Sequence, residues 1–202
     1  MPLTKITTKN YLNDLVSKAP IIYSEYLEAF SRTDNAKPPG LLGWDLTEIV
    51  SNREIQSNVN LIPTLETAIT ALPENVYPIM ITISTIHGGK LTDGAKHKEP
   101  YPPEMHRYHI PLAICDGATL NIKENDGVFR GYGWEEGFAF EFENPQNEHY
   151  LSHNDVLEDR TVMVIDVFED VEPTETERIL INKISTSFIK KDVDPTHPME
   201  EE

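Results

Sequence analysis

Two residue types that bind transition metals lie two positions apart in the segment Asp93 to Leu112, DGAKHKEPYPPEMHRYHIPL. His97 and Glu99 are separated by one residue, so in an extended chain their side chains project in the same direction. An imidazole and a carboxylate on one side of the chain can hold a cation together. The pair needs a third ligand from elsewhere. The spacing therefore predicts one edge of a metal site.

A distant histidine and an arginine can complete this site. His149 lies in NPQNEHYLSHN, and Arg160 opens the apolar run RTVMVIDVF. Non-haem iron(II) enzymes hold the metal with two histidines and one carboxylate, which leaves positions open for oxygen and a co-substrate. A guanidinium can bind a carboxylate through two hydrogen bonds. The order His97, Glu99, His149, Arg160 is what a 2-oxoglutarate oxygenase needs, with three metal ligands and an anchor for the far carboxylate.

Four segments carry a resemblance to a known family: ITISTIHGGKLTDGAKHKE, HRYHIPL, WEEGFAFEFENPQNEH and NDVLEDRTVMVIDVF. In their order and spacing they resemble the aspartyl/asparaginyl β-hydroxylase family, which are 2-oxoglutarate and iron(II)-dependent oxygenases with a double-stranded β-helix fold. The resemblance covers roughly Trp44 to Phe168. It implies that His97 and His149 bind iron and that Arg160 anchors 2-oxoglutarate. It also implies co-substrate contacts for Arg107, His109 and Ser84.

The chain departs from the family at Glu99, where family members carry Asp or Gly. Glutamate is a longer carboxylate that can still bind a metal. The loop before His97 is also longer than in the family, and this leaves His87, in the HGG motif, as an alternative first ligand.

Plainer interpretations exist for the predicted co-substrate residues. Arg160 could form an ordinary ion pair at the start of a strand with Asp159 or Glu158. Arg107 and His109 alternate around one residue of a predicted strand, so they could also be a structural polar pair.

Four other residues are expected to have supporting roles. His106 and His153 are expected around the site or at the surface rather than as ligands, and Trp134 is expected to pack in a turn. Cys115 is the single cysteine, so the chain cannot form an intramolecular disulfide, and we expect a small buried core residue there.

The elements that must position these residues are mainly β-strands. Apolar residues recur at helical intervals in 9–16 and 21–30, and a further helix is expected from Pro63 to Leu72. From Tyr77 onward the chain consists of short β-rich runs at a spacing typical of a sandwich or barrel. The predicted strands cover residues 77–86, 106–114, 118–124, 127–133, 137–143 and 160–168.

The expected fold is mainly β with N-terminal helices, around a double-stranded β-helix (jelly-roll, cupin-like) core. Residues 1–75 are expected to form a helical support region and 76–170 the catalytic core. A C-terminal helix or strand is predicted for 171–193, with Thr174 and Glu177 as a possible capping box. Residues 194–202 are predicted to form a disordered acidic tail.

Composition limits the partners. The chain of 202 residues carries 17 Lys and Arg against 34 Asp and Glu, a formal net charge of -17, which repels nucleic acids and anionic membranes. No apolar run approaches the roughly 20 residues that span a bilayer. We therefore expect a cytoplasmic protein without nucleic-acid or membrane partners; no feature of the sequence fixes its oligomeric state.

The predicted function is a dioxygenase that uses Fe(II), 2-oxoglutarate and molecular oxygen to hydroxylate an unactivated C–H bond, with release of succinate and CO2. The substrate would be an amino acid, or an Asp, Asn or Pro residue of a peptide or protein. Two alternatives are a cupin-type metal enzyme that does not use 2-oxoglutarate and a non-catalytic β-barrel binding module.

Overall fold

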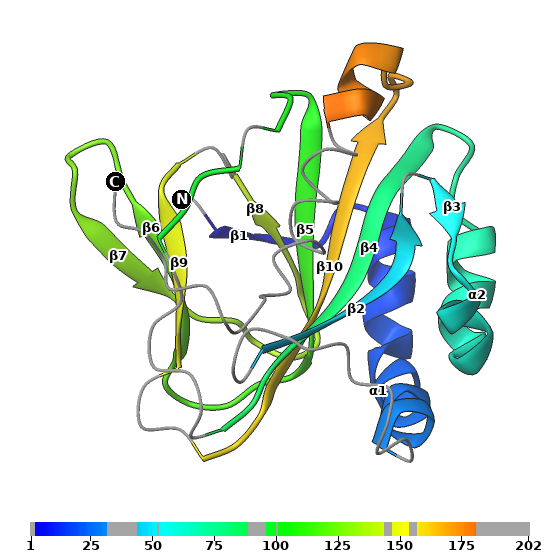
Figure 1. The fold of residues 1–202 in the computed structure, drawn as a ribbon, viewed down its shortest axis with the longest axis horizontal. Helices are drawn as coiled ribbons and strands as arrows, with labels where there is room; N and C mark the ends of the chain where they lie inside the picture. Colours follow the sequence, from blue (N-terminus) through cyan, green and yellow to red (C-terminus); the bar gives the residue numbers. More distant parts are fainter. Residues whose placement is uncertain are drawn as a thin grey trace, which may run out of the picture.

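The computed structural model describes residues 3–31, 44–51, 53–88, 96–99, 101–143, 147–153 and 157–180. Within these ranges the strands form two antiparallel sheets (Figure 1). The larger sheet has the order β1-β8-β5-β10-β4-β2-β3, and the smaller has the order β7-β6-β9. The strands are β1 (Leu3–Ile6), β2 (Trp44–Ser51), β3 (Glu54–Ile55), β4 (Val76–Ile86), β5 (Met105–Ala113), β6 (Ala118–Lys123), β7 (Phe129–Tyr132), β8 (Ala139–Phe142), β9 (His149–His153) and β10 (Arg160–Glu169).

Two α-helices cover the outer face of the larger sheet (Figure 1). Helix α1 spans Asn10–Ser31, and α2 spans Pro63–Thr70 after a short 3-10 helix, η1 (Ser57–Leu61). None of the helices in the described part of the chain has the length and apolar character that crossing a membrane requires.

Helix α1 runs through the two predicted helical stretches without a break, although Pro20 lies inside it. A proline in a helix interior removes one backbone hydrogen bond. Apolar residues at helical spacing form a buried stripe that packs against the sheet and holds the helix together across this position. The stripe consists of Leu12, Leu15, Ala19, Ile22 and Tyr26.

The central strands separate an apolar outer face from a polar inner face. On β10, Met163 and Ile165 belong to the core shared with the helices. Because side chains alternate along a strand, Arg160 and Asp166 lie on the opposite face, toward the smaller sheet. On β5, Tyr108 packs on the outer face, in the core shared with the helices. Its neighbours Arg107 and His109 therefore point to the inner face. The larger sheet thereby presents Ser84, Arg107, His109, Arg160 and Asp166 on one face.

A further apolar cluster packs the smaller sheet against the larger one. Leu120 and Ile122 of β6 pack against Phe140 and Phe142 of β8, together with Leu3. The inner face is therefore apolar at this cluster and polar where the residues of β5 and β10 face inward.

The prediction of a mainly β chain with N-terminal helices is confirmed. Each of the six predicted strands is present with ends shifted by a few residues. Strand β9 was not predicted, because HYLSH contains too few apolar residues to suggest a strand. The region 1–75, expected to be helical, also contributes β1, β2 and β3 to the large sheet.

The predicted capping box is present at the C-terminal helix. The Thr174 backbone N–H donates to a Glu177 carboxylate oxygen at 2.7 Å, and the Glu177 N–H donates to the Thr174 hydroxyl at 3.3 Å. Residues 175–180 are helical. The remainder of the predicted C-terminal element and the predicted tail at 194–202 lie outside the described residues.

We predict that Leu15→Ala lowers the free energy of unfolding by about 2–5 kcal/mol, because it opens a cavity between α1 and the sheet. Leu15 is 2% exposed, whereas Leu27, on the same helix, is 44% exposed. Leu27→Ala is the matched control and should change stability by less than about 0.5 kcal/mol. Urea unfolding followed by circular dichroism measures both values; equal losses would contradict the docking of this helix face.

Candidate metal centre and anion anchor

His97 and His149 are held next to each other by backbone hydrogen bonds. The His97 N–H donates to the His149 carbonyl at 3.0 Å, and the His149 N–H donates back at 2.9 Å. The two form an isolated antiparallel bridge, and their ring centroids lie 4.4 Å apart. The segment around His97 is thus attached to the first residue of β9. The structure therefore brings together two histidines that lie far apart in the sequence.

Glu99 completes a group of three possible metal ligands. One ligand atom from each of His97, Glu99 and His149 lies within 4.8 Å of the others. Glu99 is 5% exposed and His149 is 4% exposed. A Glu99 carboxylate oxygen lies 3.9 Å from His149 Nε2. The two histidines and one carboxylate predicted from the sequence therefore converge, and their donor atoms fit a divalent transition metal.

The tautomer of His149 suits a metal ligand. Its Nδ1 lies 2.8 Å from the carbonyl oxygen of Asn147, so Nδ1 carries the proton and donates. Nε2 is left with its lone pair on the side of Glu99. The pKa of His149 is lowered to about 4, mainly by burial; the hydrogen bond to Asn147 opposes this shift, and electrostatic interactions with His97 and Arg107 add to it. The imidazole is therefore neutral near pH 7, as metal binding requires.

Arg107 holds Glu99 in place from β5. Its guanidinium donates to Asp166 of β10 through Nε at 2.7 Å and through Nη2 at 2.8 Å. Nη2 also donates to the Tyr101 hydroxyl at 2.8 Å, and Nη1 donates to a Glu99 carboxylate oxygen. Arg107 and Asp166 are cross-strand neighbours in the sheet register. The guanidinium therefore links the metal-ligand segment to the central strands.

The net charge of the buried network of Arg107, Glu99 and Asp166 favours a nearby cation. Burial lowers the pKa of Arg107, but the carboxylates of Asp166 and Glu99 raise it well above its ordinary value overall. Burial raises the pKa of Asp166, and Arg107 opposes that shift. Two carboxylates face one guanidinium, so the network carries one excess negative charge when all three are ionised. A divalent metal beside Glu99 would compensate this charge.

Arg160 is a buried cation that no described carboxylate neutralises. Its side chain is 1% exposed, and its Nη1 donates to the Ser84 hydroxyl at 3.4 Å. Its Nε has no hydrogen-bond partner in the described part of the chain. Burial lowers the pKa of Arg160 to about 9, which is the consequence of an unpaired charge in a dry site. Such a group fits an anionic ligand that supplies the missing acceptors.

His109 lies within electrostatic reach of both Arg160 and the metal-ligand group. It is 5% exposed, and its Nδ1 accepts a hydrogen bond of 3.1 Å from the indole N–H of Trp134. Burial lowers the pKa of His109 well below its usual value, and the charges of Arg160, Arg107 and His149 add to the effect. The imidazole is therefore neutral.

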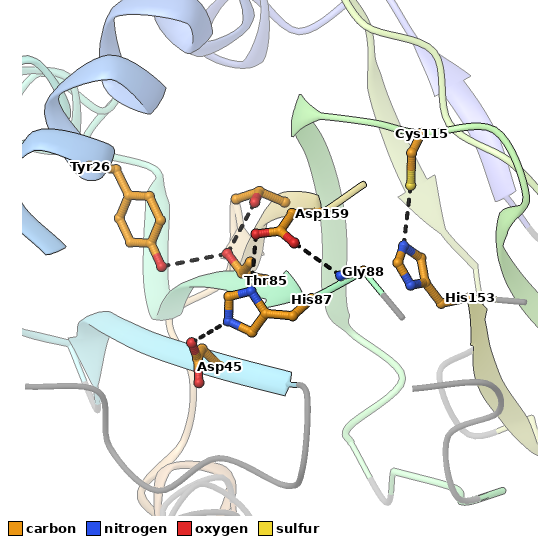
Figure 2. A network of polar contacts seen from close by, with 9 residues as sticks. Tyr26, Asp45, Thr85, His87, Gly88, Cys115, His153 and Asp159 are labelled. Atoms are coloured by element: carbon orange, nitrogen blue, oxygen red, sulfur yellow. Dashed lines mark hydrogen bonds and ion pairs between the residues drawn. The ribbon is translucent and has the colours of Figure 1, made fainter. Parts of the chain in front are cut away.

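His87, the alternative first ligand, is engaged elsewhere. Figure 2 shows its ring between two carboxylates, with Nε2 at 2.6 Å from Asp45 and Nδ1 at 3.0 Å from Asp159. The Gly88 N–H donates to the same Asp159 side chain at 3.0 Å. His87 is not part of the three-residue ligand group. Asp159 was the alternative partner of Arg160, and these contacts occupy it instead.

His153 and His106, which were expected to have supporting roles, both contact other side chains. His153 is 1% exposed, and its Nε2 lies 3.2 Å from the sulfur of Cys115, a contact drawn in Figure 2. His106 pairs with Glu141 through Nδ1 at 2.7 Å. Cys115 is half-buried rather than a core residue.

Sequence reasoning missed three residues of this region. Asp166 was counted as part of an apolar strand, although an acidic residue within RTVMVIDVF signals a buried ion pair. Nothing in the sequence pointed to a functional contact of Tyr101 except its position two residues after Glu99. Trp134 was expected only to pack in a turn, but it contacts both His109 and Arg160.

Comparison with known proteins establishes the fold. The chain matches no protein-family model and no curated protein sequence. A prolyl hydroxylase from Trichoplax adhaerens, solved with a peptide fragment of the hypoxia inducible factor oxygen degradation domain, has a similar structure. Its TM-score is 0.54 at 13% identity, over 89% of this chain and 86% of the other.

Two bacterial structures are also similar. AviO1 from Streptomyces viridochromogenes has a TM-score of 0.50 at 12% identity, over 86% of this chain and 92% of its own. A prolyl-4-hydroxylase from Pseudomonas putida has a TM-score of 0.49 at 12% identity, over 85% and 94%. The likeness to the Trichoplax enzyme and to AviO1, at such low identity, establishes a shared fold alone. The predicted double-stranded β-helix is therefore confirmed.

We predict that the purified protein binds one Co(II) ion, a spectroscopic substitute for iron(II), at His97, Glu99 and His149. His97→Ala and His149→Ala should each remove most of the visible absorption of bound cobalt, because each removes a ligand. His87→Ala is the matched control and should keep it, since His87 faces Asp45 and Asp159. Loss of the cobalt spectrum in His87→Ala, with retention in His97→Ala, would contradict this ligand set.

Proposed function

We propose that this protein is a 2-oxoglutarate- and iron(II)-dependent dioxygenase that hydroxylates an unactivated C–H bond. One observation carries the proposal: a group of two histidines and one glutamate, with His149 and Glu99 buried and His97 half-buried, lies in the same fold as a buried arginine without a carboxylate partner among the described residues. The first suits a metal and the second suits an anion. The sequence resemblance to the aspartyl/asparaginyl β-hydroxylase family supports the same class.

His97, Glu99 and His149 would hold the iron. When bound, iron(II) supplies the oxygen activation that hydroxylation of a C–H bond requires. The His149 side chain is set for this role by the carbonyl of Asn147, which fixes the proton on the ring nitrogen away from Glu99.

Arg160 would bind the far carboxylate of 2-oxoglutarate. Its Nε lacks a partner, and Ser84 contacts its Nη1 from β4. A carboxylate placed there would accept hydrogen bonds from the guanidinium and neutralise a buried charge. Ser84 supports the guanidinium from one side by accepting its hydrogen bond. His109, whose Nδ1 accepts a hydrogen bond from Trp134, has Nε2 as its donor for the co-substrate.

For Arg107 we propose a role different from the co-substrate contact implied by the family resemblance. Its guanidinium donates to Glu99, Tyr101 and Asp166. It would therefore orient the metal-binding carboxylate rather than bind 2-oxoglutarate. This contact also gives the longer Glu99 side chain a fixed position where the family has aspartate or glycine.

The overall reaction would convert a C–H bond, O2 and 2-oxoglutarate into C–OH, succinate and CO2. One oxygen atom enters the hydroxyl group and the other enters succinate, while 2-oxoglutarate is oxidised by the loss of CO2. The substrate proposed is an amino acid, or an Asp, Asn or Pro residue of a peptide. The Trichoplax enzyme of similar fold, solved with a peptide fragment, supports testing peptides alongside free amino acids.

We predict a visible charge-transfer band when 2-oxoglutarate is added to the anaerobic iron(II) protein. Arg160→Ala should weaken 2-oxoglutarate binding about 100-fold, because truncating one partner of a buried charged pair costs about 2–5 kcal/mol. Cobalt binding is the control and should not change, since Arg160 is not a ligand. Succinate release in oxygen, screened with peptides and free amino acids, identifies the substrate class.

Two other outcomes would contradict the proposal. Bound metal without any effect of 2-oxoglutarate would favour a cupin-type metal enzyme that does not use this co-substrate. Failure to bind iron(II) and cobalt would favour a non-catalytic binding module.

We predict that Arg107→Lys lowers metal affinity about 10–100-fold, as removal of groups that orient metal ligands does. Lysine keeps the charge but cannot bridge Glu99 and Asp166 through a planar fork. His106→Asn, at the neighbouring position of β5, is the matched control and should bind metal normally. Unchanged metal affinity in Arg107→Lys, together with weakened 2-oxoglutarate binding, would instead support a direct co-substrate contact.

A further inference from the structure

Trp134 contacts two residues that line the proposed co-substrate site. It lies in the segment between β7 and β8 and is half-buried. Its indole N–H donates to Nδ1 of His109 at 3.1 Å, and the two rings are stacked with centroids 5.9 Å apart. The Cζ atom of Arg160 lies 4.2 Å from the centroid of the same indole. One side chain therefore touches both His109 of β5 and Arg160 of β10.

The hydrogen bond from Trp134 fixes the tautomer of His109. The indole nitrogen can only donate, so Nδ1 of His109 must accept and carries no proton. The proton of the neutral ring is therefore on Nε2, which becomes a hydrogen-bond donor. Without the indole N–H, His109 could also adopt the opposite tautomer and present an acceptor. An acceptor at this place would repel an anionic ligand.

The face of the indole orients the guanidinium of Arg160. The hydroxyl of Ser84 lies at 3.4 Å, near the upper limit for a hydrogen bond, so it holds the guanidinium weakly. A cation stacked on an indole is attracted by the negative face of the ring, and this attraction grows when water is excluded. Trp134 therefore restrains the guanidinium of Arg160 from a second side, in addition to Ser84.

The geometry points to Trp134 as a positioning residue for the dicarboxylate co-substrate, acting through both His109 and Arg160. This inference rests on the proposed function, because it takes Arg160 as the anchor of 2-oxoglutarate. The indole ring sets the plane of the guanidinium, and the indole N–H keeps His109 as a donor. Together they prepare the site for the far carboxylate before the co-substrate binds, which lowers the entropy lost on binding.

The test measures 2-oxoglutarate binding to the anaerobic iron(II) protein in two variants. Trp134→Phe keeps an aromatic face and loses the N–H, so it should weaken binding about 3- to 10-fold, the range of one hydrogen bond. Trp134→Leu loses both contacts and should weaken binding about 10- to 100-fold. Phe138→Leu is the matched control: Phe138 belongs to the same segment but lies under Lys5, and its variant should bind normally.

A second ligand separates positioning from general damage to the site. Pyruvate has the 2-oxo acid group that chelates a metal but lacks the far carboxylate. If Trp134 acts through Arg160, Trp134→Leu should leave the binding of pyruvate and of Co(II) unchanged. Equal weakening of pyruvate and 2-oxoglutarate would overturn the inference and indicate a merely structural role.

The same measurements distinguish this inference from the proposed function. If the unaltered protein does not bind 2-oxoglutarate, the proposed function itself fails. If the unaltered protein binds it and both Trp134 variants bind equally well, the proposed function stands and the positioning role of Trp134 is wrong.

Discussion

The structure of the site depends on the buried guanidinium of Arg107. It joins Glu99, which lies outside the sheets, to Asp166, at the centre of the larger sheet. Loss of any member of such a network leaves a buried charge without its partner, at a cost of about 3–5 kcal/mol. The Glu99 end of the metal-ligand segment is therefore fixed by the pairing of β5 and β10, whereas His97 is held by its backbone hydrogen bonds to His149 of β9. The positions of His97 and Glu99 are consequences of the sheet register as much as of the local sequence.

The inner face of the larger sheet has one region that favours a cation and another that favours an anion. Around Arg107, the carboxylates of Glu99 and Asp166 outnumber the guanidinium and favour a cation. At the beginning of β10, Arg160 is buried without a described carboxylate and favours an anion. His109 is within electrostatic reach of both regions and is neutral. A ligand that chelates a metal at one end and carries a carboxylate at the other satisfies both, which is the chemistry of a 2-oxo dicarboxylic acid.

Local patterns were sufficient to predict most strands and the pair His97 and Glu99, because strand alternation and the His-x-Glu spacing are short-range features. His149 was proposed because the pair needs a distant third ligand and because of the family resemblance. The partners of Arg107 could not be predicted from the sequence. Its contact with Asp166 depends on which strands are neighbours, because the two residues are 59 positions apart in the chain. The contacts of Trp134 could not be predicted for the same reason. They are with His109 of β5 and Arg160 of β10, and these two strands become neighbours only in the folded chain. Strand β9 was missed because it is short and polar, and it is held by pairing with β6 and with His97.

The chain has 34 acidic residues, yet Arg160 has no carboxylate partner among the described ones. Its nearest acidic neighbour in the sequence, Asp159, lies directly before β10 and contacts other groups. The carboxylate of Asp159 accepts the Gly88 N–H and contacts His87, which also contacts Asp45 (Figure 2). The approach of these segments is close: a Cβ at Gly88 would lie 1.9 Å from the carbonyl oxygen of Leu157. His87 and Gly88 therefore bind the Asp159 side chain directly before β10. His87, the alternative metal ligand of the sequence, thus has structural contacts of its own: it contacts the carboxylate that precedes Arg160 in the chain, and no described carboxylate pairs with Arg160 itself.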